Sequence, residues 1–429
     1  MADFQATMLS GMAESVGRRR EAMLYAGYEM QKGLLAGGAR AAKLNAELLM
    51  SPLNPLSYTG VGPMMASALD VFAHAAAIYG KPAFGLDSTE IDGKTVPVRE
   101  EVILQKPFGQ LKRFVREGVT GDPKLLIVAP MSGHYATLLR GTVERMLPGH
   151  DVHITDWRDA RNVPLSEGDF GLDDYVDYVI EFLKAIGPDT HVLAVCQPSV
   201  PVYIAAALMA EDKNPCRPLT MTLMGGPIDT RKAPTVVNEL AVERPLGWYE
   251  DNVIATVPLY YPGAGRRVYP GFLQLSGFMA MNLGNHMMSH WDMFKNLVRG
   301  DDASADATKR FYAEYRAVCD MDAKFYLETV EKVFQQHLLP KGEMTHRGRK
   351  VDASKIDDIA ILAIEGEFDD ISGLGQTKAA LDMSTGLSDE YKQYYMAEKV
   401  GHYGIFNGSR WRGTIAPVVE RWIDDHAAR

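Results

Sequence analysis

The chain of 429 residues is long enough for one enlarged α/β domain, or for such a domain with a cap. Its hydrophobic share of 46% and its charged share of 23% are ordinary for a soluble globular protein. The formal net charge of −10 argues against a general nucleic-acid binder, because neutralising phosphates requires a basic surface.

The cysteines and the N-terminus indicate the compartment and exclude several kinds of site. Three cysteines, Cys196, Cys216 and Cys319, make a poor disulfide framework for a chain of this length. No CxxC pair or Cys/His cluster has zinc-ligand spacing, so we expect neither a metal nor a cofactor. The N-terminus lacks a basic segment followed by an apolar one, and no apolar run approaches the length of a membrane span. We therefore expect a cytoplasmic protein with reduced thiols.

Residues 1–90 are rich in Ala, Met, Leu and Gly, and we predict that they form an N-terminal helical segment. Helix-like periodicity covers residues 21–35, 39–50 and 64–79, and the proline-containing stretch 51–55 interrupts it. Two interpretations stay open. The helices either pack against the body of the protein or form a docking layer with an adaptable, methionine-rich surface.

Strands begin at about residue 95. Residues 96–105 and 111–117 predict an antiparallel hairpin, and residues 124–129 form a continuous apolar run typical of a strand covered on both faces. Further strands are expected at 152–155, 191–195 and 219–224, alternating with helices at 135–147, 173–186 and 202–210. This alternation predicts a mostly parallel, doubly wound α/β sheet.

The alternation stops after residue 228 and returns at two late apolar strands, 359–364 and 391–396. Aromatic, methionine and helical stretches dominate the residues in between. We therefore predict an α/β core formed by residues 91–228 and 358–429, with residues 229–357 inserted as a cap over the active site.

One turn combines a strand end, a helix start and a nucleophile. Cys196 directly follows an apolar strand and precedes a helix start, which is the layout of a nucleophile elbow. The elbow pattern has small residues two positions before and after the nucleophile. Ala194 fits, but Pro198 stands where glycine is expected; proline is tolerated there because the first helical turn leaves its N–H groups unpaired anyway. A buried cysteine at a strand end is the alternative interpretation.

Each of the two late strands leads to a residue that a cysteine nucleophile needs. The first leads to Asp369 and Asp370, and the second leads to His402. The order nucleophile, acid, histidine is that of α/β-hydrolases, and all three would lie at carboxyl ends of parallel strands. Asp369 is preferred to Asp370 because it lies in a Gly-x-x-Asp turn. The sequence therefore predicts a catalytic triad of Cys196, Asp369 and His402.

The expected roles follow from proton chemistry. A free cysteine has a pKa of about 8.5, so its thiol needs a neighbouring imidazole near neutral pH. His402 is expected to take the proton from Cys196 and later to return one to the leaving alcohol. Asp369 is expected to orient the imidazole and to stabilise its cationic form.

Two backbone donors are expected to stabilise the oxyanion of a tetrahedral intermediate. One is the N–H of Gln197, directly after the nucleophile. The other comes from Met131 or Ser132, in the loop that follows the first parallel strand. His134 in the same loop is an alternative base, but its position and its order in the chain favour His402.

Several motifs resemble those of intracellular polyhydroxybutyrate depolymerases, in the order in which that family has them. They are PMSGHYATLLR at 130–140, VCQPSVP at 195–201, residues 277–299, EGEFDDI at 365–371 and GHYGIFNG at 401–408. The resemblance covers most of the chain from about residue 90 onward. The Cys-Asp-His triad of that family falls on Cys196, Asp369 and His402.

This resemblance implies an intracellular enzyme of the α/β-hydrolase fold that hydrolyses ester bonds of poly(3-hydroxybutyrate) or related short-chain polymers in amorphous granules. The intermediate would be a thioester, the products 3-hydroxybutyrate monomers or oligomers, and the granule surface the partner. A homo-oligomer is left open.

Two other functions are weighed against hydrolysis. A polyhydroxyalkanoate synthase-like acyltransferase would use the same triad, but in a Gly-x-Cys-x-Gly elbow that Ala194 and Pro198 do not match. A non-catalytic granule-binding protein on a decayed hydrolase fold is the third hypothesis, and the complete triad argues against it.

Overall fold

The computed structural model describes residues 2–281 and 283–427, which form two compact units. The helical unit combines three stretches, Met1–Pro82, Gly133–Tyr135 and Val253–Asp320. The sheet unit combines the other three, Ala83–Ser132, Ala136–Asn252 and Met321–Arg429. The predicted boundaries of an N-terminal segment, a core and an inserted cap stay a prediction.

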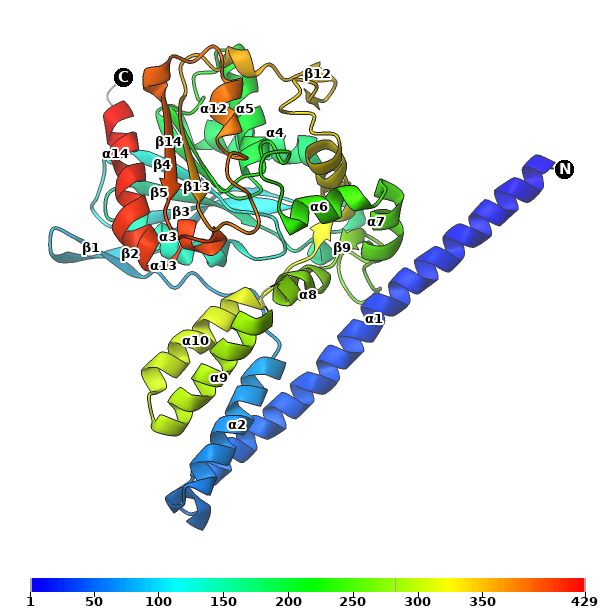
Figure 1. Cartoon of the computed structure of the whole chain (residues 1–429), viewed down its shortest axis with the longest axis vertical. Helices are drawn as coiled ribbons and strands as arrows, with labels where there is room; N and C mark the ends of the chain where they lie inside the picture. Colours follow the sequence, from blue (N-terminus) through cyan, green and yellow to red (C-terminus); the bar gives the residue numbers. More distant parts are fainter. Residues whose placement is uncertain (1, 282, 428–429) are drawn as a thin grey trace. The chain divides into compact units, whose positions relative to one another are not determined.

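Within the described residues, the sheet unit contains a nine-stranded sheet with the order β1-β2-β3-β5-β4-β6-β7-β13-β14 (Figure 1). The strands are β1 Ser88–Ile91, β2 Lys94–Lys106, β3 Gly109–Arg116, β4 Lys124–Val128, β5 Asp151–Trp157, β6 Thr190–Val195, β7 Thr220–Met224, β13 Ala360–Gly366 and β14 Lys392–Ala397. Pairing is antiparallel from β1 to β5 and parallel from β5 to β14. From β2 onward, this order is that of the α/β-hydrolase fold, so the predicted fold is confirmed.

The central strands are apolar because helices cover the sheet on both faces. Every residue of β6, β7 and β13 is buried. The α-helices of this unit are α3 Arg140–Met146, α4 Leu172–Ile186, α5 Ser199–Glu211, α6 Val236–Glu243, α7 Leu246–Val253, α11 Ala323–Glu328, α12 Ala379–Met383, α13 Gly408–Arg410 and α14 Ala416–His426. Two π-helical turns follow α11 and α13, at Thr329–Gln335 and Trp411–Ile415. The helices α4 and α5 pack side by side (Figure 1). The helix α14 lies against β7 and β13.

Each strand expected from hydrophobic patterning is present, with ends within about two residues of those predicted. The strand β1 was not expected, and its first residues lie in the segment predicted to be helical. One expected helix differs at its start. The helix predicted over residues 135–147 begins as a 3-10 turn, Ala136–Leu139, before α3 takes over. All four residues of that turn are buried, so packing rather than helical periodicity fixes this segment.

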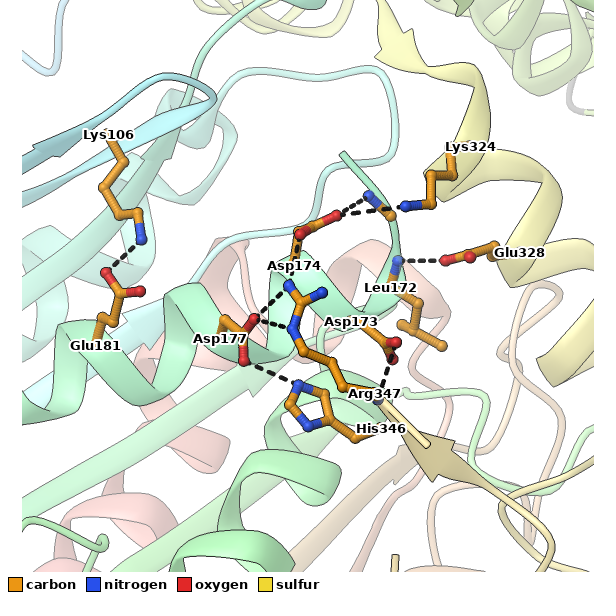
Figure 2. Close-up of polar contacts among 11 residues, drawn as sticks. Lys106, Leu172, Asp173, Asp174, Asp177, Glu181, Lys324, Glu328, His346 and Arg347 are labelled. Atoms are coloured by element: carbon orange, nitrogen blue, oxygen red, sulfur yellow. Dashed lines mark hydrogen bonds and ion pairs between the residues drawn. The ribbon is translucent and has the colours of Figure 1, made fainter. Parts of the chain in front are cut away.

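A short hairpin, β11 (Thr345–His346) and β12 (Arg349–Lys350), is fastened to α4 by an arginine at its tip. Figure 2 shows Arg347 reaching three carboxylates of the first turns of α4. Its backbone N–H donates to Asp173 at 3.0 Å, and its guanidinium donates to Asp174 and Asp177, each at 2.7 Å. Arg349 forms ion pairs with Glu211, the last residue of α5, and with Asp212, which directly follows it. These contacts hold residues 345–350 on the two helices of the core.

The helical unit contains one long helix, α1, and several shorter helices (Figure 1). Its elements are α1 Ala2–Met50, a 3-10 turn Pro55–Tyr58, α2 Val61–Ala76, β8 Ala255–Thr256, β9 Arg267–Tyr269, α8 Gly271–Met281, α9 Leu283–Arg299 and α10 Asp302–Tyr315. The helix α2 packs against α1 and α9, and α9 packs against α10. An ion pair between Asp70 and Lys309, 2.5 Å apart, links α2 with α10.

The two helices expected at residues 21–35 and 39–50 are one continuous helix, α1. Glycines at positions 37 and 38 lower the helix propensity of this stretch but do not end the helix. A Cβ built on Gly38 would lie 3.8 Å from the ring of Phe72, so α2 packs closely at this point. This packing maintains the helix where local propensity is weak.

No helix within the described part of the chain combines the length and the apolar content that a membrane span requires.

Candidate active site

Cys196 occupies the turn between β6 and α5 in a strained backbone conformation. Its φ of 69° lies in the left-handed region, which non-glycine residues adopt at a cost. Two backbone hydrogen bonds hold the turn: Cys196 N–H donates to the Met224 carbonyl at 2.7 Å, and Ser199 N–H donates to the Cys196 carbonyl at 3.0 Å. The side chain is half-buried. Pro198 is the N-cap of α5 with φ −56°, a value that proline adopts without strain.

A second glycine-containing turn packs directly beneath this elbow. A Cβ on Gly226 would lie 2.1 Å from the side chain of Ser199 and 3.1 Å from the Cys196 carbonyl oxygen. The N–H of Gly226 donates to Thr377 Oγ1 at 2.8 Å, which holds this turn in place. Only glycine therefore fits at position 226, because any side chain would displace the start of α5.

His402 and Asp369 form a buried hydrogen-bonded pair. Their side chains are 4% and 0% exposed, and His402 Nδ1 lies 2.8 Å from Asp369 Oδ2. The other carboxylate oxygen of Asp369 accepts from the backbone N–H groups of Ile371 at 2.9 Å and Ser372 at 2.8 Å. The structure thus brings Asp369 to the histidine, whereas the neighbouring Asp370 is exposed.

The third member of this group is Cys196, whose thiol is near enough to His402 to raise the pKa of the imidazole. Burial alone would lower the pKa of His402, but the neighbouring Cys196 and Asp369 outweigh it and hold the pKa well above its ordinary value. The geometry therefore favours an imidazolium between a sulfur and a carboxylate. Such an arrangement can generate a thiolate nucleophile.

Gly225 leaves room for the histidine and the carboxylate. Its φ is 58°, and a Cβ there would lie 3.2 Å from each of Asp369 Oδ2, His402 Cε1 and Ile405 Cδ1. Gly225 was not among the site residues predicted from the sequence. The signal in the sequence was Gly-Gly-Pro directly after a buried strand. Glycine is needed there because the turn has a positive φ and because side chains from other segments lie close to the backbone.

The two expected sources of oxyanion donors follow β6 and β4. Among residues 2–281 and 283–427, the backbone N–H groups of Gln197 and Met131 donate to no acceptor. Ser132, the alternative to Met131, does take part in a polar or electrostatic interaction. The loop after β4 is held at its first residue, because the Ala129 carbonyl accepts from Trp157 Nε1 at 2.7 Å and from a tyrosine hydroxyl of α4 at 3.0 Å.

The alternative base, His134, belongs to the helical unit. It is buried, and one of its ring nitrogens, Nε2, lies 2.9 Å from the Tyr315 carbonyl oxygen. Burial lowers the pKa of His134 to about 4, although the hydrogen bond to Tyr315 opposes this shift. These contacts explain His134 as a neutral packing residue.

A protein family described as PHB de-polymerase C-terminus matches residues 225–427. This match begins at Gly225 and contains Asp369 and His402. The poly(3-hydroxyalkanoate) polymerase subunit PhaC of Haloferax mediterranei is 24% identical over 316 residues, which are 71% of this chain and 59% of that protein. The chain thus matches less than two thirds of the length of that relative.

Two solved structures are similar at low identity. One is 2-hydroxy-6-oxo-6-phenylhexa-2,4-dienoate hydrolase from Rhodococcus sp. strain RHA1, with 12% identity over 77% of this chain and 100% of that chain, and a TM-score of 0.43. The other is the α/β hydrolase GrgF from Penicillium sp. sh18, with 12% identity over 78% of this chain and 100% of that chain, and a TM-score of 0.44. The strand order is that of the α/β-hydrolase fold, and residues 225–427 match the C-terminal domain of the PHB de-polymerase family.

Proposed function

We propose that this protein hydrolyses the ester bonds of poly(3-hydroxybutyrate), or of a related short-chain polyhydroxyalkanoate, in amorphous granules inside the cell. The observation that carries the proposal is the group of Cys196, His402 and Asp369, in which His402 is hydrogen-bonded to Asp369 and both neighbours raise its pKa. Residues 225–427 of the same chain match the PHB de-polymerase C-terminus. In this proposal, residues 229–357 form a cap over the active site.

In the first step, the thiolate of Cys196 attacks the carbonyl carbon of the polyester. The carbonyl oxygen becomes an oxyanion, and the unpaired N–H groups of Gln197 and Met131 are the donors that we assign to it, with Ser132 as the alternative to Met131. When the intermediate collapses, the C–O bond breaks and the imidazolium of His402 gives its proton to the departing alkoxide. An alcohol leaves, and a thioester to Cys196 stays.

In the second step, water hydrolyses the thioester. Neutral His402 takes a proton from the attacking water, whose oxygen forms a bond to the acyl carbon. Collapse of this second intermediate breaks the C–S bond and releases the carboxylic acid product, and the thiolate and imidazolium are restored. Throughout, Asp369 accepts the Nδ1 proton of His402, which keeps Nε2 directed at the reacting atoms.

The test compares the wild type with Cys196→Ala on amorphous poly(3-hydroxybutyrate), with chromatography of the released acids. We expect the rate to fall by at least about 10³-fold, because the nucleophile is removed while binding is kept. Cys216→Ala is the matched control: it removes another half-buried thiol, outside the proposed triad, and should keep full activity. Polymer cleavage by Cys196→Ala at the wild-type rate would refute the proposal.

A second candidate function is acyl transfer in the direction of polymer synthesis. It is favoured by the similarity to a poly(3-hydroxyalkanoate) polymerase subunit. The proline at position 198 argues against it, since the synthase elbow that we compared in the sequence has glycine there. Incubation with 3-hydroxybutyryl-coenzyme A separates the two functions, because release of coenzyme A with growth of polymer would assign the synthase reaction.

A further inference from the structure

The helices α1 and α2, which pack against each other, have small residues inside and large apolar residues outside. The buried positions of α2 are Gly62, Ala66, Ser67 and Ala73. In residues 25–50 of α1, the buried positions are Tyr25 and four alanines, at 36, 39, 42 and 46. A helix on the surface of a globular protein usually buries its large apolar residues instead. Small residues between helices and large apolar ones outside are typical of helix pairs in an apolar surrounding.

Within residues 25–50 of α1, four large apolar residues lie on one exposed side of the helix, and Leu35 and Met50 are exposed elsewhere. Met30, Leu34, Leu44 and Leu48 are all exposed, and at 100° per residue they fall within about 80° of arc. The buried alanines lie on the opposite side of the helix. The five charged residues of this stretch, Glu29, Lys32, Arg40, Lys43 and Glu47, fall at the edge of that arc or outside it.

The apolar surface continues past the end of α1 into the connecting loop and onto α2. In the loop, Leu53 is 94% exposed and Tyr58 is 78% exposed. The exposed large apolar residues of α2 are Val61, Met64, Met65 and Phe72. We call residues 30–72 the apolar hairpin. It is wider than the narrow seam that a coiled-coil partner covers, because it spans two helices and a loop.

The α2 side of the apolar hairpin carries almost no charge, although the chain as a whole carries −10. Between residues 51 and 80 the formally charged side chain is Asp70, and Lys309 neutralises it in an ion pair. Burial, followed by nearby cations, lowers the pKa of His74 to about 4, so this imidazole is neutral at pH 7. Helices that bind anionic lipid surfaces instead place Lys and Arg on their polar face.

We infer that the apolar hairpin is the surface with which this protein binds the neutral polyester of the granule. The inference rests on the proposed function, because that function supplies an apolar, uncharged and insoluble partner. Protruding leucines and a tyrosine can insert into an amorphous polymer without a shaped pocket. The match lies in the chemistry: an uncharged apolar face on the protein meets an uncharged apolar phase.

The test measures co-sedimentation with surfactant-free particles of amorphous poly(3-hydroxybutyrate), in a Cys196→Ala background so that polymer is not consumed. The test variant carries Leu44→Gln, Leu48→Gln and Leu53→Gln. The matched control variant removes three exposed apolar side chains of the sheet unit outside the proposed cap, with Val102→Gln, Ile103→Gln and Leu165→Gln. We expect the affinity for particles to fall at least about tenfold in the test variant and to change less than about twofold in the control.

Folding and chemistry are checked separately. With Cys196 restored, both variants should keep wild-type circular dichroism and wild-type hydrolysis of the soluble ester p-nitrophenyl butyrate. If the triple variant misfolds, Met64→Gln with Met65→Gln replaces it, because both methionines are exposed. Failure of the proposed function would appear as a wild-type protein that binds the particles but releases no 3-hydroxybutyrate, and this result leaves the sedimentation assay readable because no polymer is consumed.

Three results would overturn the inference. The first is unchanged sedimentation of the folded test variant. The second is equal, leucine-dependent binding to vesicles of phosphatidylcholine alone or with phosphatidylglycerol, which would assign the hairpin to lipid. The third is self-association of the wild type that the leucine substitutions abolish while particle binding persists, which would assign the hairpin to a second copy of the chain.

Discussion

The effect of replacing Asp369 by asparagine can be worked out from its three hydrogen bonds. One carboxylate oxygen accepts from the backbone N–H groups of Ile371 and Ser372, and the other accepts from His402 Nδ1. In Asp369→Asn, the amide oxygen can still serve the two backbone groups, which turns the amide NH2 toward the histidine. Because NH2 donates, the ring must then carry its proton on Nε2, where it cannot accept the proton of the thiol.

This change of tautomer sets the expected magnitude. In hydrolytic triads, it costs about 10³- to 10⁴-fold in kcat, which is about 4 to 5.5 kcal/mol of transition-state stabilisation. The substitution should also lower the pKa of His402, because Asp369 is one of the groups that raise this pKa against burial. The expected result is a folded protein with little activity and a histidine that titrates at lower pH.

The assay is hydrolysis of soluble 3-hydroxybutyrate oligomers at pH 7, with the rate of Cys196 alkylation followed against pH as a second readout. Asp370→Asn is the matched control, because Asp370 is the exposed neighbour. It should keep activity within about twofold. The reasoning would be refuted if Asp369→Asn stayed within tenfold of the wild type, or if Asp370→Asn lost as much activity.

Two further predictions concern residues around the site and in the core. Gly225→Ala places a Cβ 3.2 Å from Asp369 and His402 at a position with a positive φ, so we expect a lower kcat and a melting temperature that is lower by several degrees. Gly118→Ala is the control: this glycine has a similar φ but open space around it, so the substitution should lower stability and leave kcat unchanged. Burial, followed by the charges of nearby histidines, lowers the pKa of His191 to about 4. Because the unfolded chain then binds the extra proton below about pH 6.5, the wild type should lose about 2 kcal/mol of stability from this group between pH 7 and pH 5. Urea unfolding of His191→Gln should lack that loss, and an identical pH dependence in both proteins would contradict the assignment.

The sheet could be predicted from the sequence because its central strands are short apolar runs that end at turn residues. The apolar pattern of each strand lies within a few consecutive residues, so it can be recognised without knowing which strands lie beside it. The same holds for the three residues brought together at the strand ends. Cys196, Asp369 and His402 are distant in the chain, but parallel strands deliver their carboxyl ends to one edge of the sheet.

Features that depend on close contacts between distant segments were not predictable. Gly226 is required because Ser199 lies 2.1 Å from the position of its missing Cβ, and nothing local in the sequence records that approach. The helix α1 continues through two glycines because α2 packs there. From the sequence, Arg347 would be interpreted as a surface residue of a turn. In the fold, it lies beside the acidic residues at the start of α4 and binds them.

The division of the chain has a consequence for its synthesis. The last stretch of the helical unit, Val253–Asp320, contains α9, which packs on α2. At typical ribosome speeds of about 5 to 20 residues per second, the roughly 200 residues between α2 and α9 take about 10 to 40 seconds to make. During that interval α2 leaves the ribosome without this partner, so the part of its surface that α9 covers in the folded protein is added to the apolar surface that is already exposed. We therefore expect the nascent chain to depend on chaperones, and a fragment that ends before residue 253 to aggregate even though it contains most of the parallel strands.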